Sequence, residues 1–199
     1  LEPAAEASST PVLGYLARMC ADKGLHTLID AYCELKKSHA DLRLRVVGVV
    51  LPEDRRFLKE CKRKLAAAGV LESVSFHPNV SREEKLQHLG QFSLFSVPAT
   101  YGESFGLYLL EAMACGVPVV QPRHASFPEL IERTGGGVLC PADDAQGLAR
   151  ALDGLLTDPE GMRRMGERGR LAVHEHFTVD RMAAEVEAII AGGTDSADG

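Results

Sequence analysis

Two glutamates, Glu103 and Glu111, stand eight residues apart within a glycine turn and the apolar run that follows it. The run, residues 105–115, stops at Gly116 and predicts a helix of about three turns. Glu111 is its only charged residue, and a helix that is apolar on all sides is normally buried. We therefore expect a buried carboxylate at Glu111, which requires hydrogen-bond donors from the protein or from a ligand such as a ribose diol.

Glu103 lies in the turn that leads into this helix. Free backbone N–H groups and the positive end of the helix dipole gather there, so the helix start at Phe105, Gly106 and Leu107 could hold a phosphate. Sugar, diphosphate and ribose follow one another in that order in a nucleotide-sugar. The pattern equally allows Glu103 to be a helix-capping acid and Glu111 to be a core residue paired with an arginine or lysine from elsewhere.

Two cations follow the first predicted strand. Residues 11–17 form an apolar run, and Arg18 and Lys23 come directly after it, before an amphipathic helix with Asp22 as its expected N-cap. Ligands of open α/β sheets collect at the carboxyl ends of the strands, where an arginine and a lysine could bind phosphate. The alternative is a solvated surface pair.

The whole chain alternates between strand-like and helix-like segments. Strands are expected at 11–17, 41–50, 73–76, 92–97, 117–120 and 135–140, and helices at 52–68, from Ser81, after Asp143, from Pro159 and at 179–190. Ser81 and Glu84 have the spacing of a capping box. This order predicts an α/β fold, a doubly wound, Rossmann-like parallel sheet of about six strands with helices on both faces.

Composition excludes several classes of protein. The chain has 199 residues, 45% of them hydrophobic, and a net charge of −6, which argues against a nucleic-acid partner. It has no apolar run of about 18 residues that could cross a membrane. Five widely spaced cysteines favour reduced thiols in a cytoplasmic protein, and no zinc pattern is present.

The ends of the chain differ from its centre. Residues 1–10 are rich in alanine and serine and resemble a linker, and residues 192–199 have the composition of a disordered tail. We therefore expect one lobe at residues 11–191. The absence of an initial methionine suggests a fragment of a longer protein.

The segment Glu103-Ser-Phe-Gly, four further residues and Glu111-Ala-Met-Ala-Cys-Gly resembles the Glu-x7-Glu signature of the group 1 (family 4) retaining glycosyltransferases, which have the GT-B architecture. In that family the first glutamate contacts donor-sugar hydroxyls and the second binds the ribose. The family's Arg-x4-Lys-Gly pattern, whose cations bind the donor diphosphate, matches Arg18, Lys23 and Gly24. Ala17 departs from the glycine often found before that arginine.

The resemblance covers the carboxyl-terminal, donor-binding lobe of such an enzyme. It implies a UDP- or GDP-linked sugar donor, no cofactor and no metal, and it places the base near Asn79 and Val80. The acceptor site would lie in an amino-terminal lobe that is absent from the chain. Two alternatives remain: a non-catalytic nucleotide-sugar-binding module, and a GT-B relative such as an epimerase or phosphorylase.

Overall fold

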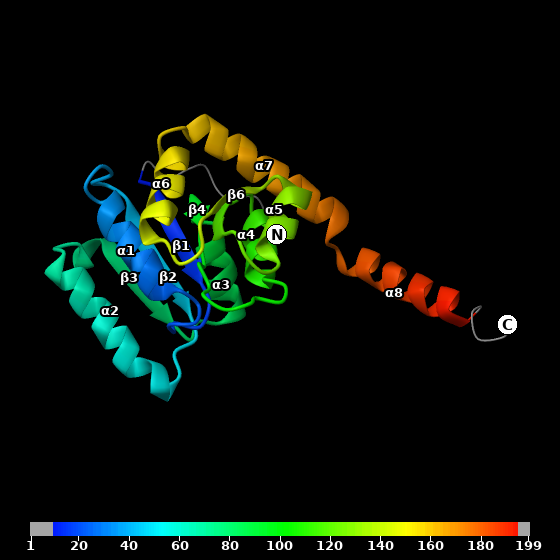
Figure 1. Cartoon of the computed structure of the whole chain (residues 1–199), viewed down its shortest axis with the longest axis horizontal. Helices are drawn as coiled ribbons and strands as arrows, with labels where there is room; N and C mark the ends of the chain where they lie inside the picture. Colours follow the sequence, from blue (N-terminus) through cyan, green and yellow to red (C-terminus); the bar gives the residue numbers. More distant parts are fainter. Residues whose placement is uncertain (1–9, 195–199) are drawn as a thin grey trace.

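Six parallel strands form one sheet in the order β3-β2-β1-β4-β5-β6 in the computed structural model, which describes residues 10–194 (Figure 1). The strands are β1 (Val12–Leu16), β2 (Arg43–Gly48), β3 (Val74–Pro78), β4 (Leu94–Phe95), β5 (Val119–Pro122) and β6 (Gly137–Cys140). All five residues of β1 are buried, as expected for a parallel strand covered on both faces. The predicted fold class is confirmed.

Helices cover both faces of this sheet (Figure 1). One face carries α1 (Leu25–Leu35), α2 (Arg55–Ala67) and α6 (Ala145–Leu156), and the other carries α3 (Arg82–Leu89), α4 (Leu107–Ala114) and α5 (Phe127–Thr134). The long helix α7 (Pro159–His176) packs on α4 and α5. Two short 3-10 helices, η1 (Pro52–Asp54) and η2 (Leu71–Ser73), precede α2 and β3.

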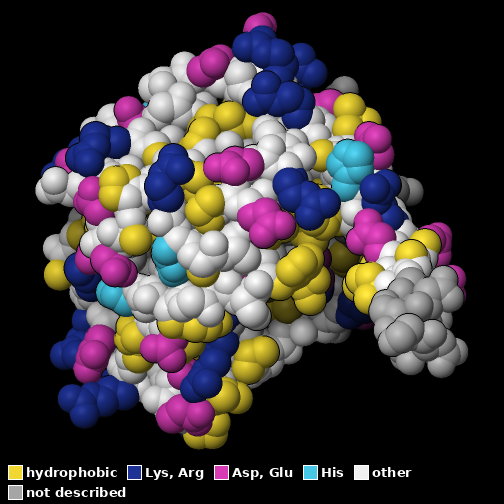
Figure 2. All heavy atoms as spheres, turned by 45° about the vertical axis from the view of Figure 1, so that its right-hand side comes forward, with side chains coloured by type: hydrophobic (Ala, Val, Ile, Leu, Met, Phe, Trp, Pro, Cys, Tyr) yellow, Lys and Arg dark blue, Asp and Glu magenta, His cyan; other side chains and the backbone are white. Residues whose placement is uncertain are grey.

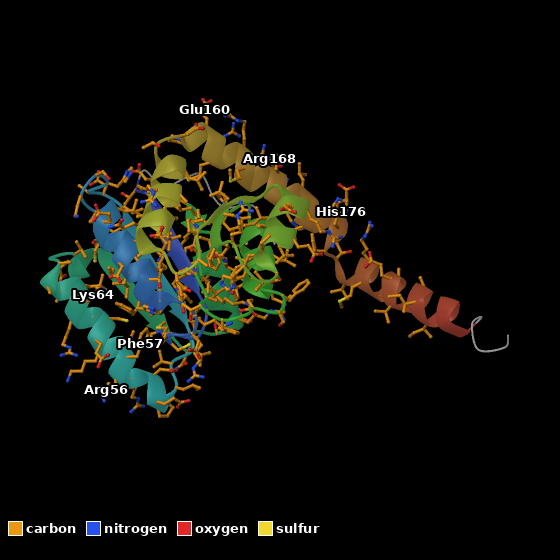
Figure 3. The ribbon with its side chains drawn as sticks, viewed as in Figure 1. Arg56, Phe57, Lys64, Glu160, Arg168 and His176 are labelled. Carbon is orange, nitrogen blue, oxygen red and sulfur yellow. The ribbon has the colours of Figure 1, made fainter. Side chains whose placement is uncertain are left out.

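Helix α2 has a core side and a cationic side. Phe57 lies between α2 and α1, where its ring contacts His26 at a centroid distance of 6.1 Å, whereas Arg56 points away from the body (Figure 3). The exposed side carries further cations, among them Lys59, Lys62 and Arg63.

The last helix, α8 (Val179–Thr194), extends away from the rest of the molecule (Figure 1). Figure 2 shows it standing apart from the body, with hydrophobic side chains on its surface. Met182, Val186 and Ile189 are 62%, 50% and 74% exposed. The helix continues beyond residue 191, where the sequence had placed the end of the lobe. Residues 1–9 of the predicted linker and 195–199 of the predicted tail lie outside the described residues.

The sheet reverses its direction of winding between β1 and β4. β1 pairs with β2 on one side and β4 on the other, so the chain leaves these two neighbouring strands toward opposite edges. In open α/β sheets this switch point creates a crevice at the carboxyl ends of the strands, where ligands bind. Arg18 follows β1 and Glu103 follows β4, so the two predicted groups meet at this edge.

Several predicted element ends are wrong, although Ser81 and Glu84 do form the expected capping box. Helix α1 begins after Gly24 in a left-handed conformation rather than at Asp22, and α6 begins after Asp144 rather than Asp143. Strand β4 spans two residues instead of six. The predicted helix over 52–68 is a 3-10 turn followed by α2, and that over 105–115 is α4 without its two ends.

Candidate functional site

Two loops lie against each other at the switch point. The loop after β1 contains Asp22, and the loop after β4 contains Thr100, whose backbone N–H donates to the Asp22 carbonyl oxygen at 2.9 Å. A Cβ atom at Gly24 would stand 1.7 Å from the carbonyl oxygen of Pro98, and Gly24 has φ of 69°. Only glycine fits this close approach, which holds the two loops together.

Glu103 is the centre of a charged cluster between these loops. Its Oε2 accepts hydrogen bonds from Lys23 Nζ at 2.6 Å, Tyr108 Oη at 3.0 Å and Tyr101 Oη at 3.2 Å. Lys23 also donates to the Tyr101 hydroxyl, and its ammonium group lies 4.8 Å from the centroid of that ring. The side chains of Lys23 and Glu103 are 19% and 11% exposed, so the pair is largely shielded from water.

The cluster keeps both members of the ion pair charged. Burial alone would raise the pKa of Glu103, but the hydrogen bonds from Lys23 and Tyr108 lower it below 4.5. Burial alone would lower the pKa of Lys23, but its hydrogen bonds to Glu103 and Tyr101 raise it above 10.5. Burial and the charge of Glu103 raise the pKa of Tyr108, which therefore stays a neutral donor.

Arg18 is held by a different carboxylate. Its Nε donates to Asp54 Oδ2 at 2.8 Å, and Nη2 donates to Asp54 Oδ1 and Glu53 Oε1, both at 2.9 Å. Asp54 is 5% exposed and also accepts from the Leu51 backbone N–H at 3.0 Å. The hydrogen bonds to Asp54 raise the pKa of Arg18 further. Within the described residues Nη1 has no partner, so one side of the guanidinium is fixed and the other is available.

The prediction of a buried carboxylate at Glu111 is wrong. The side chain is 36% exposed and forms an ion pair with Lys85 of α3, with Nζ 2.7 Å from Oε1. The reason is that α4 has an outward stripe: Leu107, one turn earlier on the same side, is 65% exposed. The pairing matches the alternative in which a lysine from elsewhere binds Glu111, but the residue is not in the core.

The start of α4 is open to solvent. Gly106 is the N-cap, with φ of 81°, and no side-chain hydrogen bond caps the helix within the described structure. Phe105 and Leu107 on either side are 45% and 65% exposed. The backbone N–H groups here are those predicted to hold a phosphate, and they directly follow Glu103.

Asn79 and Val80 lie at the same edge, beyond the end of β3. The Asn79 backbone N–H donates to the Gly48 carbonyl oxygen at 2.8 Å, and its Oδ1 accepts from the Val50 N–H at 3.1 Å. Asn79 therefore ties the ends of β2 and β3 together, and Val80 packs against the core. Both residues are two strands away from the switch point, so the structure does not bring them together with Glu103.

Sequence reasoning missed Tyr101, Tyr108 and Asp54. The two tyrosines flank Glu103, and five apolar neighbours surround Tyr108 in the sequence, which made it look like a core residue. Asp54 lies in the segment 52–68 that was predicted to be one helix. A carboxylate that precedes a helix after the second strand is a weak signal, because its partner Arg18 is 36 residues away.

Other candidate groups have no ligand-binding arrangement in the described part of the chain. His77 lies in β3, and the centroid of its ring is 4.3 Å from that of the His88 ring. All five cysteines are free thiols. Among residues 10–194 no group of three or more histidine, cysteine, aspartate or glutamate side chains is placed to hold a metal ion, and no helix is long and apolar enough to span a bilayer.

Comparison with known proteins agrees with this fold and identifies the family. Residues 2–172 match the family described as glycosyl transferases group 1, and the chain belongs to that family. The putative colanic acid biosynthesis glycosyltransferase WcaL of Escherichia coli K12 is 31% identical over 189 residues, which are 93% of this chain and 46% of that protein.

Two further relatives are informative. The GDP-mannose-dependent α-(1-6)-phosphatidylinositol monomannoside mannosyltransferase of Mycolicibacterium smegmatis is 32% identical over 85% of this chain and 44% of its own length. The solved C-terminal domain of the group 1 glycosyl transferase LpcC from Francisella tularensis has a TM-score of 0.78 and 25% identity, covering 85% of this chain and 87% of that one. The chain thus spans less than half of the two full-length relatives, but nearly all of an isolated C-terminal domain.

Proposed function

We propose that this chain is the donor-binding domain of a retaining glycosyltransferase that transfers a hexosyl group from a UDP- or GDP-linked sugar to an acceptor. The observation that carries the proposal is the meeting of Lys23, Glu103 and the open start of α4 at the switch point, with Arg18 at the adjacent strand end. Family membership and the GDP-mannose dependence of a relative support a nucleotide-sugar as the ligand.

Each group has a role in this proposal. Glu103 accepts a hydrogen bond from a donor-sugar hydroxyl, Glu111 accepts from the ribose diol, and Arg18 and Lys23 bind the diphosphate together with the N–H groups near Gly106. The base lies near Asn79 and Val80. During transfer, the bond between the anomeric carbon and the phosphate oxygen breaks, a bond between the anomeric carbon and the acceptor oxygen forms, and the proton of the acceptor hydroxyl passes to the departing phosphate. The cations stabilise the negative charge that develops on the leaving oxygen.

Two cations and a helix start replace the divalent ion that other enzymes use to neutralise a diphosphate. We therefore expect donor binding to be the same with and without EDTA. The free thiols of the described chain support a cytoplasmic location, because oxidising compartments favour disulfides.

The acceptor belongs to a second, amino-terminal domain in this proposal. Transfer requires the acceptor oxygen to be held close to the anomeric carbon, and positioning of that kind supplies several kcal/mol of rate enhancement, up to about 7 to 11. We expect the chain alone to bind donor without transferring the sugar.

Calorimetric titration of the chain with UDP-glucose, GDP-mannose and ADP-glucose tests the first part of the proposal. One of the first two should bind, and its bare nucleoside should bind much more weakly.

Transfer is then followed with labelled donor in the presence and absence of the amino-terminal domain. If none of the three nucleotide-sugars binds, the proposal that this chain binds the donor is rejected. If the chain alone transfers the sugar at the intact enzyme's rate, the proposal that the acceptor site lies in a second domain is rejected. Donor binding with no transfer by the reassembled enzyme would favour a non-catalytic module.

A further inference from the structure

Three donors meet at a single oxygen of Glu103. Lys23, Tyr108 and Tyr101 all donate to Oε2, at 2.6, 3.0 and 3.2 Å. A carboxylate oxygen has about two lone-pair directions, so these donors leave no room for another on Oε2. The protein therefore uses one of the two carboxylate oxygens completely.

The other oxygen, Oε1, accepts no hydrogen bond from the described residues. Buried side-chain polar atoms without a partner are confined, in the described part of the chain, to His77 and Gln121. Oε1 of Glu103 is not among them, so it reaches solvent even though the side chain as a whole is only 11% exposed. The carboxylate is thus fixed by one oxygen, and the other remains accessible to solvent.

Tyr108 is the most firmly held of the three donors. It lies in the first turn of α4, is half-buried, and packs its ring 6.2 Å from that of the buried Phe95. Tyr101 is 42% exposed and shares its hydroxyl with Lys23. Lys23 has a long side chain with four methylene groups and, in the proposed function, also binds the diphosphate. When Lys23 turns toward phosphate, Tyr108 remains as the donor anchored in the fold.

We propose that Tyr108 is a positioning residue that fixes Oε2 of Glu103, so that a single oxygen, Oε1, recognises a hydroxyl group of the donor sugar. This inference rests on the proposed function of Glu103. It adds that Glu103 does not grip a vicinal diol with both oxygens, because the second oxygen is already occupied. Discrimination by Glu103 should therefore concentrate on one position of the sugar ring.

The test compares a nucleotide-sugar with its own nucleoside diphosphate, because the difference in affinity isolates the sugar. UDP-glucose with UDP, or GDP-mannose with GDP, is used, whichever pair the unaltered chain binds more tightly. Tyr108→Phe keeps the ring and removes the hydroxyl. We expect the sugar-dependent part of the affinity to fall by about tenfold, as for a lost hydrogen bond to a charged group, with binding of the diphosphate unchanged.

Tyr32→Phe is the matched control. The Tyr32 hydroxyl donates to the Leu42 carbonyl oxygen at 2.9 Å and to Ser73 Oγ at 2.8 Å, near the amino-terminal ends of β2 and β3 and away from the switch point. This variant should lower the melting temperature and leave the sugar-dependent affinity intact. Equal losses for the nucleotide-sugar and the diphosphate in Tyr108→Phe would show a merely structural role and overturn the inference, as would no loss at all.

The pH profile gives a second readout. The Tyr108 hydrogen bond lowers the pKa of Glu103, so its removal should move the loss of sugar-dependent affinity to a higher pH as the solution is acidified. An unchanged profile would contradict the positioning role. Deoxy analogues of the same nucleotide-sugar test whether Glu103 contacts a single hydroxyl group. Removal of one hydroxyl should abolish most of the affinity difference between the unaltered chain and Glu103→Gln. Equal losses on removal of either of two adjacent hydroxyls would contradict the single contact.

Glu103→Gln separates failure of this inference from failure of the proposed function. If Glu103→Gln leaves the sugar-dependent affinity unchanged, Glu103 does not contact the sugar and both fail. If Glu103→Gln loses that affinity but Tyr108→Phe does not, the proposed function stands and the positioning role fails. A double variant that loses no more than Glu103→Gln alone supports action of Tyr108 through Glu103.

Discussion

The two glutamates of the central motif have the same side chain but opposite environments. Glu103, before α4, is 11% exposed and receives three hydrogen bonds on one oxygen. Glu111, in the second turn of α4, is 36% exposed and pairs with a single lysine, Lys85, which is itself 29% exposed. Glu103 is built into the protein before any ligand arrives, whereas Glu111 remains a surface group whose partner is easily exchanged.

The two environments predict different contributions of Glu103 and Glu111 to folding stability. Disturbing a shielded carboxylate with several donors is unfavourable, so in the proposed function Glu103 would couple ligand binding to the stability of the switch-point loops. A partly exposed ion pair contributes little to stability. Glu111 can therefore exchange Lys85 for a ligand with little change in the unfolding free energy.

The largest effect is expected at the Glu103 end, from Lys23→Ala. The change leaves a shielded carboxylate without its cation and should destabilise the chain by about 2 kcal/mol, less than the 3 to 5 of a fully buried pair. Affinity for a nucleoside diphosphate should fall much more than affinity for the nucleoside. Denaturant unfolding and calorimetry measure the two quantities.

Lys37→Ala is the control for this change, because Lys37 is 72% exposed and pairs with Glu34 on the surface. It should alter neither quantity. Arg18→Ala should share the diphosphate-selective loss. Equal losses for nucleoside and diphosphate would remove both cations from the phosphate site.

The second-largest effect is expected from Glu111→Gln, in the second turn of α4. Glu111→Gln should weaken nucleotide-sugar binding by about 1 to 3 kcal/mol, the range for hydrogen bonds to a charged group. The unfolding free energy should change by less than about 0.5 kcal/mol, as for most surface substitutions. A nucleotide lacking the ribose hydroxyls should bind both proteins equally. A large fall in melting temperature with unchanged donor affinity would instead make Glu111 a structural residue.

The sequence was sufficient for the architecture and for the edge of the sheet where the site lies. A doubly wound parallel sheet follows from the alternation of buried strands and helices. The strand order, and with it the switch point between β1 and β4 that brings Arg18 and Glu103 to one edge, comes from the structure. The ends of elements were less predictable. Helix α1 begins after Gly24, whose left-handed conformation and close approach to the Pro98 carbonyl group only glycine allows. This contact joins segments 74 residues apart, and no local pattern reveals it.

The environment of the site residues was the least predictable feature. An apolar run around Glu111 suggested burial, but α4 is only eight residues long and leaves one side uncovered. Likewise, the partners of Arg18 and Lys23 come from segments 36 and 80 residues away. Pairing of this kind depends on how the loops fold over the switch point, which periodicity does not determine.

A smaller effect is expected from pH, because the Glu103 cluster has shifted pKa values. The pKa of Glu103 is lowered below 4.5, so its contribution to stability is present above that value and is lost as pH falls through the folded-state pKa. The pKa of Lys23 is raised above 10.5, so its contribution is present below that value and is lost as pH rises further. The difference in unfolding free energy between the unaltered chain and Glu103→Gln should be constant between about pH 6 and pH 9 and shrink in acid. A difference that changes steadily across the neutral range would contradict this assignment.

The smallest effect is expected from Lys85→Ala, and it addresses the comparison most directly. Lys85 lies 2.7 Å from Glu111 and is partly exposed, so removing it should lower the unfolding free energy by no more than ~1 kcal/mol. A ribose diol that binds Glu111 has to compete with this lysine. Lys85→Ala should therefore leave nucleotide affinity unchanged or raise it slightly, whereas Lys23→Ala at the other end lowers it.

Paired calorimetric titrations of the two variants with the same nucleoside diphosphate measure this contrast. A loss of affinity in Lys85→Ala as large as that in Lys23→Ala would mean that Lys85 itself holds the ligand, and that both ends of α4 carry preformed binding groups.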